Sequence, residues 1–357
     1  MTFSTPLTRL INISYPIIQA PMVGVSTPEL AAAVSNAGGL GSIGIGASST
    51  KKAREMISAT RALTDKPFNV NVFCHRPATH DRERESNWIN YLQTFFEEFD
   101  TAPPLQLTMP YKSFNEDRPT LDMLLEERPA VVSFHFGVPT IEWVRALSDA
   151  DIVTLCCVTT PEEALIAEAS GIDFIVAQGA EAGGHRGVFE PEKGDQLLGT
   201  LALTRLITAA VKVPVIAAGG LMDGQAISAV MEAGAVGAQL GTAFILCPES
   251  AANDSYRSVL NSDCSRKTKI TSVISGRPAR GIMNRFHSNV DRLGAPSMPE
   301  YPIAYDAGKA LAAAAMSKGS LEFSAYWAGQ GAPLARELPA SELIETLVRE
   351  CHFISSH

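Results

Sequence analysis

Eight short apolar segments recur along the first two-thirds of the chain, and stretches with helical periodicity separate most of them. Each segment is five to seven residues long and shows little of the polar–apolar alternation of a half-exposed strand. Such runs are typical of parallel strands that are buried on both faces. The expected strands are residues 16–20, 40–45, 68–73, 130–134, 152–158, 172–177, 213–218 and 236–240.

Helix signals fill most of the gaps between these strands. Thr27 is a good N-cap, since Pro28 follows at the first helical position and glycines 38–39 end the apolar pattern. The expected helices are residues 28–37, 49–63, 139–147, 161–169, 198–211 and 224–232. Eight strands with intervening helices predict a TIM (β/α)8 barrel. The alternative is an open doubly wound sheet, but no GxGxxG motif opens a helix after the first strand.

Two long segments interrupt this order. Residues 74–128 carry a helix signal at 88–99, and residues 249–330 contain further helices and a glycine-rich end. Both follow strands, so a barrel places both on its C-terminal face as a lid or cap. We therefore expect a barrel of residues 1–248 and 331–357, which includes the lid insertion, and a helical insertion of residues 249–330 that completes the substrate site. A separate domain is the alternative.

Composition excludes several classes of function. The net charge is −9 without a long basic run, so we expect no nucleic-acid partner. No stretch reaches the ~20 apolar residues of a membrane span, and the N-terminus lacks a signal sequence. The six cysteines are scattered without a CxxC pair, which predicts reduced thiols, a cytoplasmic location and no metal site.

The segment 178–187 follows the sixth strand and sets His185 among glycines. Histidine exchanges protons near neutrality, and glycines let a flat ligand approach the backbone. These properties predict a reaction centre at a strand's C-terminal end with His185 as the catalytic residue. The alternative is a tight turn with an ordinary surface histidine.

Glycine-rich loops also end the seventh and eighth strands, at residues 219–220 and 241–242. In barrels these two loops often hold a phosphate through backbone N–H groups, although the glycines alone also fit sharp turns. Residues 19–22 after the first strand and the amides of Asn69 and Asn71 add donors and acceptors for a ring edge. Together they predict a phosphorylated planar cofactor, and FMN fits best.

Several motifs now form a recognisable set: residues 19–22 (QAPM), 69–73 (NVNVF), 135–137 (HFG), 178–187, 218–220 (AGG) and 327–331 (WAGQG). Together they resemble the nitronate monooxygenases, formerly called 2-nitropropane dioxygenases, over nearly the whole chain. The AGGHxG motif is shared with enoyl-acyl-carrier-protein reductases and other barrel flavoenzymes. Residues 111–117, the HFG motif and the WAGQG tail indicate class I.

The resemblance implies a TIM barrel with noncovalent FMN that oxidises alkyl nitronates, typified by propionate-3-nitronate, with O2 to carbonyl compounds plus nitrite and nitrate. It implies that His185 is the base toward neutral nitroalkanes. The implied FMN contacts are Ala20, Met22, Asn71, Gln178, Gly183, Gly220, Gln239, Leu240, Gly241, Thr242, Gly329 and Gln330.

Donors for an anionic substrate are expected in the second insertion. Tyr301, Tyr305 and Lys309 are spaced four apart, so on a helix they share one face. Tyr256 is a weaker member of this set, and His135, at the end of the fourth strand, points toward the site. The alternatives are packed tyrosines on an exposed helix and, for His135, a satisfied core histidine.

Three other functions stay open. They are an FMN-dependent enoyl-acyl-carrier-protein reductase, an NAD(P)H:quinone reductase on the same barrel, and a noncatalytic FMN-binding protein, which His185 argues against. The expected partners are a small nitronate and O2, and the chain is either a monomer or a homodimer. The remaining histidines are expected at the surface: His75, His80, His287, His352 and His357.

Overall fold

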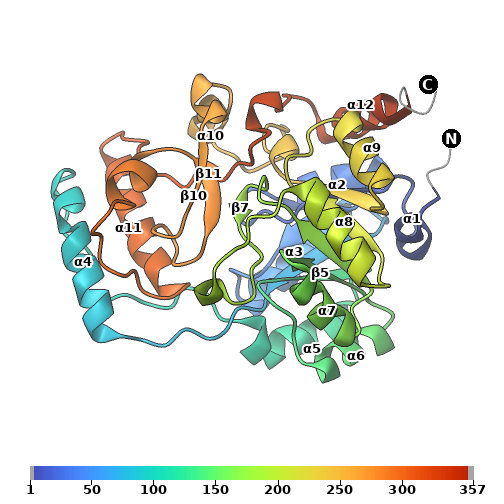
Figure 1. Ribbon diagram of the computed structural model, residues 1–357, viewed down its shortest axis with the longest axis horizontal. Coiled ribbons are helices and arrows are strands. Elements are labelled where there is room, and N and C mark those ends of the chain that lie inside the picture. The colour runs from blue at the N-terminus through green and yellow to red at the C-terminus, as the bar shows by residue number, and fades with distance from the viewer. Residues whose placement is uncertain (1–3, 353–357) are drawn as a thin grey trace.

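The computed structural model describes residues 4–352 and contains the predicted barrel (Figure 1). Eight parallel strands pair in the order β1-β9-β8-β6-β5-β4-β3-β2, and a parallel bridge between Ile18 and Leu40 joins the two ends. Each strand falls within or overlaps a predicted segment. The strands are β1 (Ile17–Gln19), β2 (Gly41–Gly44), β3 (Phe68–Phe73), β4 (Val131–His135), β5 (Val153–Val158), β6 (Phe174–Gln178), β8 (Val215–Ala218) and β9 (Gly237–Leu240).

Helices surround this barrel. Thr27 caps α2 as predicted, since its hydroxyl accepts a hydrogen bond from the Leu30 N–H at 2.9 Å. The helices α5 and α12 complete the ring and lie outside the segments predicted as helical. The barrel helices are α2 (Pro28–Asn36), α3 (Thr50–Leu63), α5 (Arg118–Glu127), α6 (Ile141–Asp149), α7 (Pro161–Ala169), α8 (Thr200–Ala210), α9 (Gly224–Glu232) and α12 (Ala340–His352).

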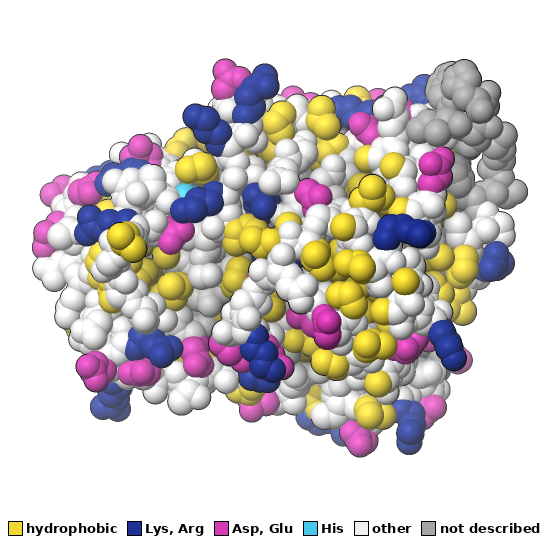
Figure 2. Space-filling view, in the orientation of Figure 1, with side chains coloured by type: hydrophobic (Ala, Val, Ile, Leu, Met, Phe, Trp, Pro, Cys, Tyr) yellow, Lys and Arg dark blue, Asp and Glu magenta, His cyan; other side chains and the backbone are white. Residues whose placement is uncertain are grey.

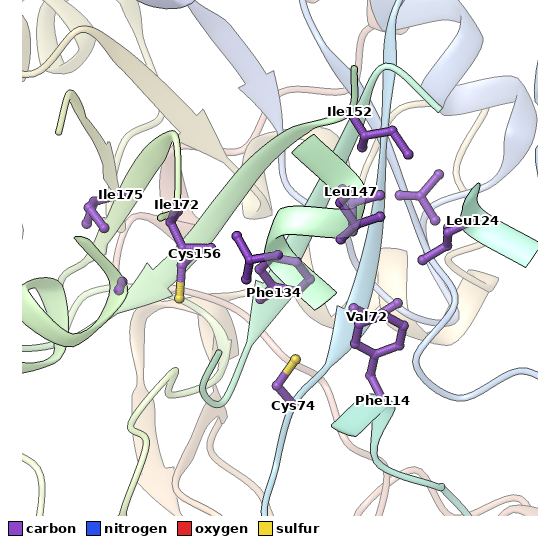
Figure 3. Packing of buried hydrophobic residues seen from close by; sticks show 14 of the residues in the cluster. Val72, Cys74, Phe114, Leu124, Phe134, Leu147, Ile152, Cys156, Ile172 and Ile175 are labelled. Carbon is purple, nitrogen blue, oxygen red and sulfur yellow. The ribbon is translucent and has the colours of Figure 1, made fainter. Parts of the chain in front are cut away.

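The largest apolar cluster fills the layer between strands and helices (Figure 3). Side chains of adjacent strands, Val72, Phe134 and Cys156, pack against Leu124 of α5 and Leu147 of α6. This burial of both strand faces is the physical reason why the strands read as unbroken apolar runs.

The N-terminal end of the barrel is closed by α1 (Pro6–Ile11), a helix that the sequence pattern did not predict. Leu7 and Ile11 of this helix join a buried cluster with strand residues such as Ile18 and Leu155. Because this end is filled, a ligand site is left to the opposite, C-terminal end.

The two insertions pack together into one cap on the C-terminal face. Trp88 and Phe95 of α4 (Arg82–Glu97) share a core with Leu311 of α11 (Ile303–Ser317), and the two helices lie side by side, away from the barrel, in Figure 1. A three-stranded antiparallel sheet, which was not predicted, joins cap to barrel. The remaining cap elements include α10 (Asp254–Leu260), and the sheet comprises β10 (Thr268–Thr271), β11 (Ala279–Ile282) and β7 (Gly184–His185).

The outer surface mixes charges of both signs on the face seen in Figure 2. Hydrophobic side chains gather there over α8, where Leu201 and Leu206 are exposed. Among the residues that the structure describes, no helix has the length and apolar character needed to cross a membrane.

Candidate active site

One cavity lies between the carboxyl ends of the barrel strands and the cap, and it encloses about 1300 Å³ including open solvent at its mouth. Gln330 and Lys309 stand just outside its wall. The other predicted site residues line it: Ala20, Met22, Asn71, His135, Gln178, Gly183, His185, Gly220, Gln239, Leu240, Gly241, Thr242, Tyr256, Tyr301, Tyr305 and Gly329.

Backbone groups form one end of the cavity. Gly219 and Gly220 adopt φ of 118° and 70°, a region that favours glycine. Within the described part of the chain, the peptide N–H groups of Gly219, Gly220 and Gly241 donate to no protein atom. Unpaired donors of this kind in a cavity wall are suited to an anion such as a phosphate.

The tail segment 327–331 is held against this end. The Gly329 N–H donates to the Thr242 hydroxyl at 3.0 Å, and the Gln330 N–H donates to the Glu181 carbonyl at 2.9 Å. Gln330 therefore acts here through its backbone, while its side chain is exposed. Gly183 is required for this packing, since a Cβ there meets the Gly329 nitrogen at 2.5 Å.

The predicted amide side chains differ in which hydrogen-bond donors and acceptors remain free for a ligand. The carbonyl oxygen of Gln178 is fully used, since it accepts from Arg186 and Gly187, whereas its amide nitrogen donates to the His185 carbonyl at 3.0 Å and keeps a second N–H for a ligand. Asn71 donates to Ser133 at 2.9 Å, which leaves its carbonyl oxygen without a partner among the described residues. Asn69 is fully buried beneath the cavity and bonds to Ser42.

His185 sits on β7, where pairing with β11 places it opposite Ala279. The Ser275 hydroxyl donates to the Arg277 carbonyl at 3.2 Å, so it accepts from Nε2–H of His185 at 2.8 Å. This network assigns the Nε2–H tautomer and leaves Nδ1 as an acceptor. Burial, with smaller contributions from His135 and Arg277, lowers the pKa of His185 to about 3, so the ring is neutral at pH 7.

His135 ends β4, as predicted, and lines the same cavity. Its Nε2–H donates to the His185 carbonyl at 3.1 Å, so it is also satisfied within the fold. Burial lowers the pKa of His135 to about 4, and this histidine too is uncharged at neutral pH. The ring of Phe136 packs 4.4 Å from that of His135 and 5.7 Å from that of His185, which makes this part of the wall aromatic.

The cap contributes tyrosines and a lysine. Tyr305 and Lys309 lie on α11, whereas Tyr301 precedes the helix, so the prediction that all three share one helical face is wrong for Tyr301. Its ring nevertheless lies 5.6 Å from the His185 ring. The ammonium of Lys309 donates to the Tyr111 hydroxyl and lies 4.8 Å from the Tyr305 ring centre. Tyr256 bonds to the Trp327 carbonyl, at the cavity's edge.

Sequence reasoning missed several residues of this wall. Tyr111 and Trp327 occur in the quoted motifs but were given no role, and both line the cavity.

His75 and His287 were expected at the surface and are buried instead, because cap segments cover them. His80 is partly exposed as expected, and His357 and the side chain of His352 lie outside the described residues. Nothing in the local sequence distinguishes a histidine that a distant segment covers.

A cavity at the carboxyl ends of the strands, with a neutral histidine in its wall and an apolar cap over it, defines a (β/α)8-barrel enzyme. The family model described as nitronate monooxygenase matches residues 4–350. The chain is 58% identical to a nitronate monooxygenase of Pseudomonas aeruginosa, over 96% of this chain and 98% of that protein. It is 38% identical to a probable nitronate monooxygenase of Staphylococcus saprophyticus, over 99% of both.

Comparison with solved structures supports the same family. A nitroalkane oxidase from Streptomyces ansochromogenes superposes with a TM-score of 0.89 at 39% identity, covering 98% of this chain and 99% of that one. FabK from Thermotoga maritima is less similar, with a TM-score of 0.76 at 29% identity, covering 99% and 97%. The chain belongs to the nitronate monooxygenase family, and it is an oxidoreductase that acts on a small molecule.

Proposed function

We propose that this enzyme uses FMN to oxidise alkyl nitronates, typified by propionate-3-nitronate, with O2 to a carbonyl compound plus nitrite and nitrate. The observation that carries the proposal is one cavity that joins unpaired backbone donors, a half-buried neutral histidine and a cluster of tyrosines that Lys309 contacts from just outside the wall. The scattered cysteines, five of them buried free thiols, support a cytoplasmic location.

The donors in the barrel half of the cavity fit FMN. Gly220, Gly241 and Thr242 would hold the phosphate through N–H and hydroxyl groups, beside Gly183 and Gly329. Asn71 and Gln239 would meet the polar edge of the ring system, and apolar contacts would come from Ala20, Met22 and Leu240. The role of Gln178 would be to position the His185 loop, and Gln330 would fix the tail. When bound, FMN accepts electrons from the substrate and passes them to O2.

The cap half fits the anionic end of the substrate. Burial raises the pKa of Tyr111 and of Tyr305 to about 12, so both hydroxyls stay protonated and can donate. Lys309 is exposed but adds a cation, whose ammonium bonds to the Tyr111 hydroxyl, and Tyr301 closes the space toward His185. We infer that this cluster binds the carboxylate of propionate-3-nitronate, with Tyr256 supporting the wall from behind.

His185 acts on the reacting carbon. For a neutral nitroalkane, Nδ1 takes the carbon proton, which requires the uncharged ring that burial provides. A base with a pKa near 3 is weak, so proton removal is slow. This suits a substrate that arrives already deprotonated, and we therefore assign nitronates rather than nitroalkanes as the better substrates. His135 holds the His185 backbone in place through its bond to the carbonyl.

An oxygen electrode with nitrite detection tests the proposal. We expect the wild-type enzyme to consume O2 and release nitrite with propionate-3-nitronate in the absence of NAD(P)H. His185→Gln should lower kcat/KM for nitroethane by about 100-fold or more, and for ethylnitronate by much less. The exposed His80 gives a matched control, because His80→Gln removes a histidine that bonds only Glu85, outside the cavity.

The reductase alternatives predict a different outcome. O2 consumption that requires NADH or NADPH, with no nitrite from propionate-3-nitronate, would contradict the proposal. Of the two solved structures compared above, the nitroalkane oxidase is the more similar, which favours the nitronate reaction.

A further inference from the structure

A buried arginine without an anionic partner lies behind the aromatic wall of the cavity. Arg277 is 4% exposed, and its Nε has no hydrogen-bond partner. Its guanidinium donates to the Val188 carbonyl, and no carboxylate among residues 4–352 forms an ion pair with it. An unpaired buried charge is costly, so an anion supplied from elsewhere would stabilise this arrangement.

Two carboxylates act on Arg277 only at longer range, and each has other direct partners. Glu163 accepts from the Phe189 N–H at 2.7 Å and from Thr159. Glu192 forms an ion pair with Arg76 at 2.9 Å, on the surface. Neither carboxylate forms an ion pair with Arg277, so its positive charge is offset only in part and at longer range.

The location of this charge relates it to the reaction centre. The guanidinium carbon lies 4.3 Å from the centre of the Phe136 ring and 6.0 Å from that of Tyr301, and both rings line the cavity. The backbone of Arg277 also bonds to Ser275, the hydroxyl partner of His185. Arg277 thus lies directly behind the rings that line the cavity, at the end of the cavity where His185 is found.

His185 and His135 cannot supply positive charge at this end, because both are neutral at pH 7. The ammonium of Lys309 belongs to the tyrosine cluster of the cap. A substrate with a carboxylate and a nitronate carries two negative groups. Lys309 accounts for one of them, and the nitronate group needs another source of positive potential.

We propose that Arg277 determines the preference for anionic over neutral substrates, by placing an unpaired positive charge behind Phe136 and Tyr301 where the nitronate group binds. This inference rests on the proposed function and deepens it. A charge acts over this distance because the intervening rings exclude water and screen little. A neutral nitroalkane has no net charge and gains little from the same potential.

The test compares two substrates that differ by one proton, ethylnitronate and nitroethane, in Arg277→Gln and Arg277→Lys. Glutamine keeps an N–H donor for Val188 but removes the charge. We expect Arg277→Gln to lower kcat/KM for ethylnitronate by at least about tenfold, with nitroethane changed by no more than about twofold. Arg277→Lys keeps the charge and should retain most of the preference.

Binding gives a readout that does not depend on turnover. Nitrate is a flat trigonal anion like the nitronate group, and its dissociation constant is measured by titrating the flavin absorbance. This dissociation constant should rise about tenfold in Arg277→Gln and change little in Arg277→Lys. Arg285 is the matched control: it also lies over a ring, 4.7 Å from the centre of Phe323, but it pairs with Glu98 outside the cavity. Arg285→Gln should bind nitrate normally.

Three results would overturn the inference: equal losses for ethylnitronate and nitroethane, unchanged nitrate binding in Arg277→Gln, or a folded Arg277→Lys that loses the anion preference. If Arg277→Gln does not fold, Arg277→Met removes the charge in its place and is expected to give the same loss of anion preference and of nitrate binding. A wild-type enzyme without nitronate turnover refutes the proposed function instead, so the two failures are distinguishable.

Discussion

The two halves of the cavity are built in different ways. The barrel half consists mainly of backbone groups and small side chains at strand ends, such as Gly220 and Gly241. The cap half consists of large side chains, Tyr111, Tyr301 and Trp327, that come from segments far apart in the sequence. Under the proposed function, the barrel half holds a cofactor common to many barrel enzymes, and the cap half selects the substrate. Changes in the two halves should therefore have separable effects.

The largest effect is expected from Gly183→Ala in the barrel half. A Cβ there lies 2.5 Å from the Gly329 nitrogen and 2.6 Å from the Ala328 carbonyl carbon, so the tail must move away. We expect the purified variant to lose most of its FMN, as measured by the flavin-to-protein absorbance ratio. Gly194→Ala is the control, because its Cβ meets nothing within 4 Å and only its φ of 90° is strained. FMN retention by Gly183→Ala would show that the tail does not contribute to cofactor binding.

Lys309→Met in the cap half should leave FMN in place and change selectivity. We expect kcat/KM for propionate-3-nitronate to fall about 10- to 100-fold, because a charge-assisted hydrogen bond is lost. Propyl-1-nitronate, which has no carboxylate, should change by no more than about twofold. Steady-state kinetics with the two substrates measures the difference, and equal losses for both would contradict a carboxylate-binding role.

A smaller, pH-dependent effect on stability should distinguish the cap half from the barrel half. Burial lowers the pKa of His75 and His135 to about 4 and of His185 to about 3, and all three lie where cap meets barrel. Unfolding restores a pKa near 6.5, so the unfolded chain binds more protons below that pH. Stability is therefore full above pH 6.5 and falls as the pH is lowered toward 4, by up to about 1.4 kcal/mol per pH unit for each histidine.

Hydrogen exchange at pH 7.5 and pH 5 measures where this loss occurs. Amides of the cap and of β7 should lose protection first, while those of β5 and β8 keep theirs. Uniform loss of protection across barrel and cap would show that the buried histidines are not responsible.

The barrel was predictable from sequence because its strands are local patterns. An unbroken apolar run such as Ile175 to Ala177 reports burial on both faces, and the glycine positions after it follow from strand ends. The predicted positions of Gly220, Gly241 and Thr242 at the cavity wall follow from the same regularity.

The seam between barrel and cap was not predictable. The strand β7 is two residues long and exists only because β11, more than ninety residues later, pairs with it. The same long-range packing buries His75 and Arg277, whose local sequences resemble those of surface residues. Tyr301 was placed on a helix by its spacing, but α11 begins at Ile303.

The most direct test of the account is anaerobic reduction of the bound flavin, followed by absorbance. The purified enzyme is mixed with propionate-3-nitronate in one cell and with NADH or NADPH in another. We predict that the nitronate bleaches the flavin and that the nicotinamides do not. Rapid reduction by NADH or NADPH without any response to the nitronate would contradict the account and assign the enzyme to a reductase activity.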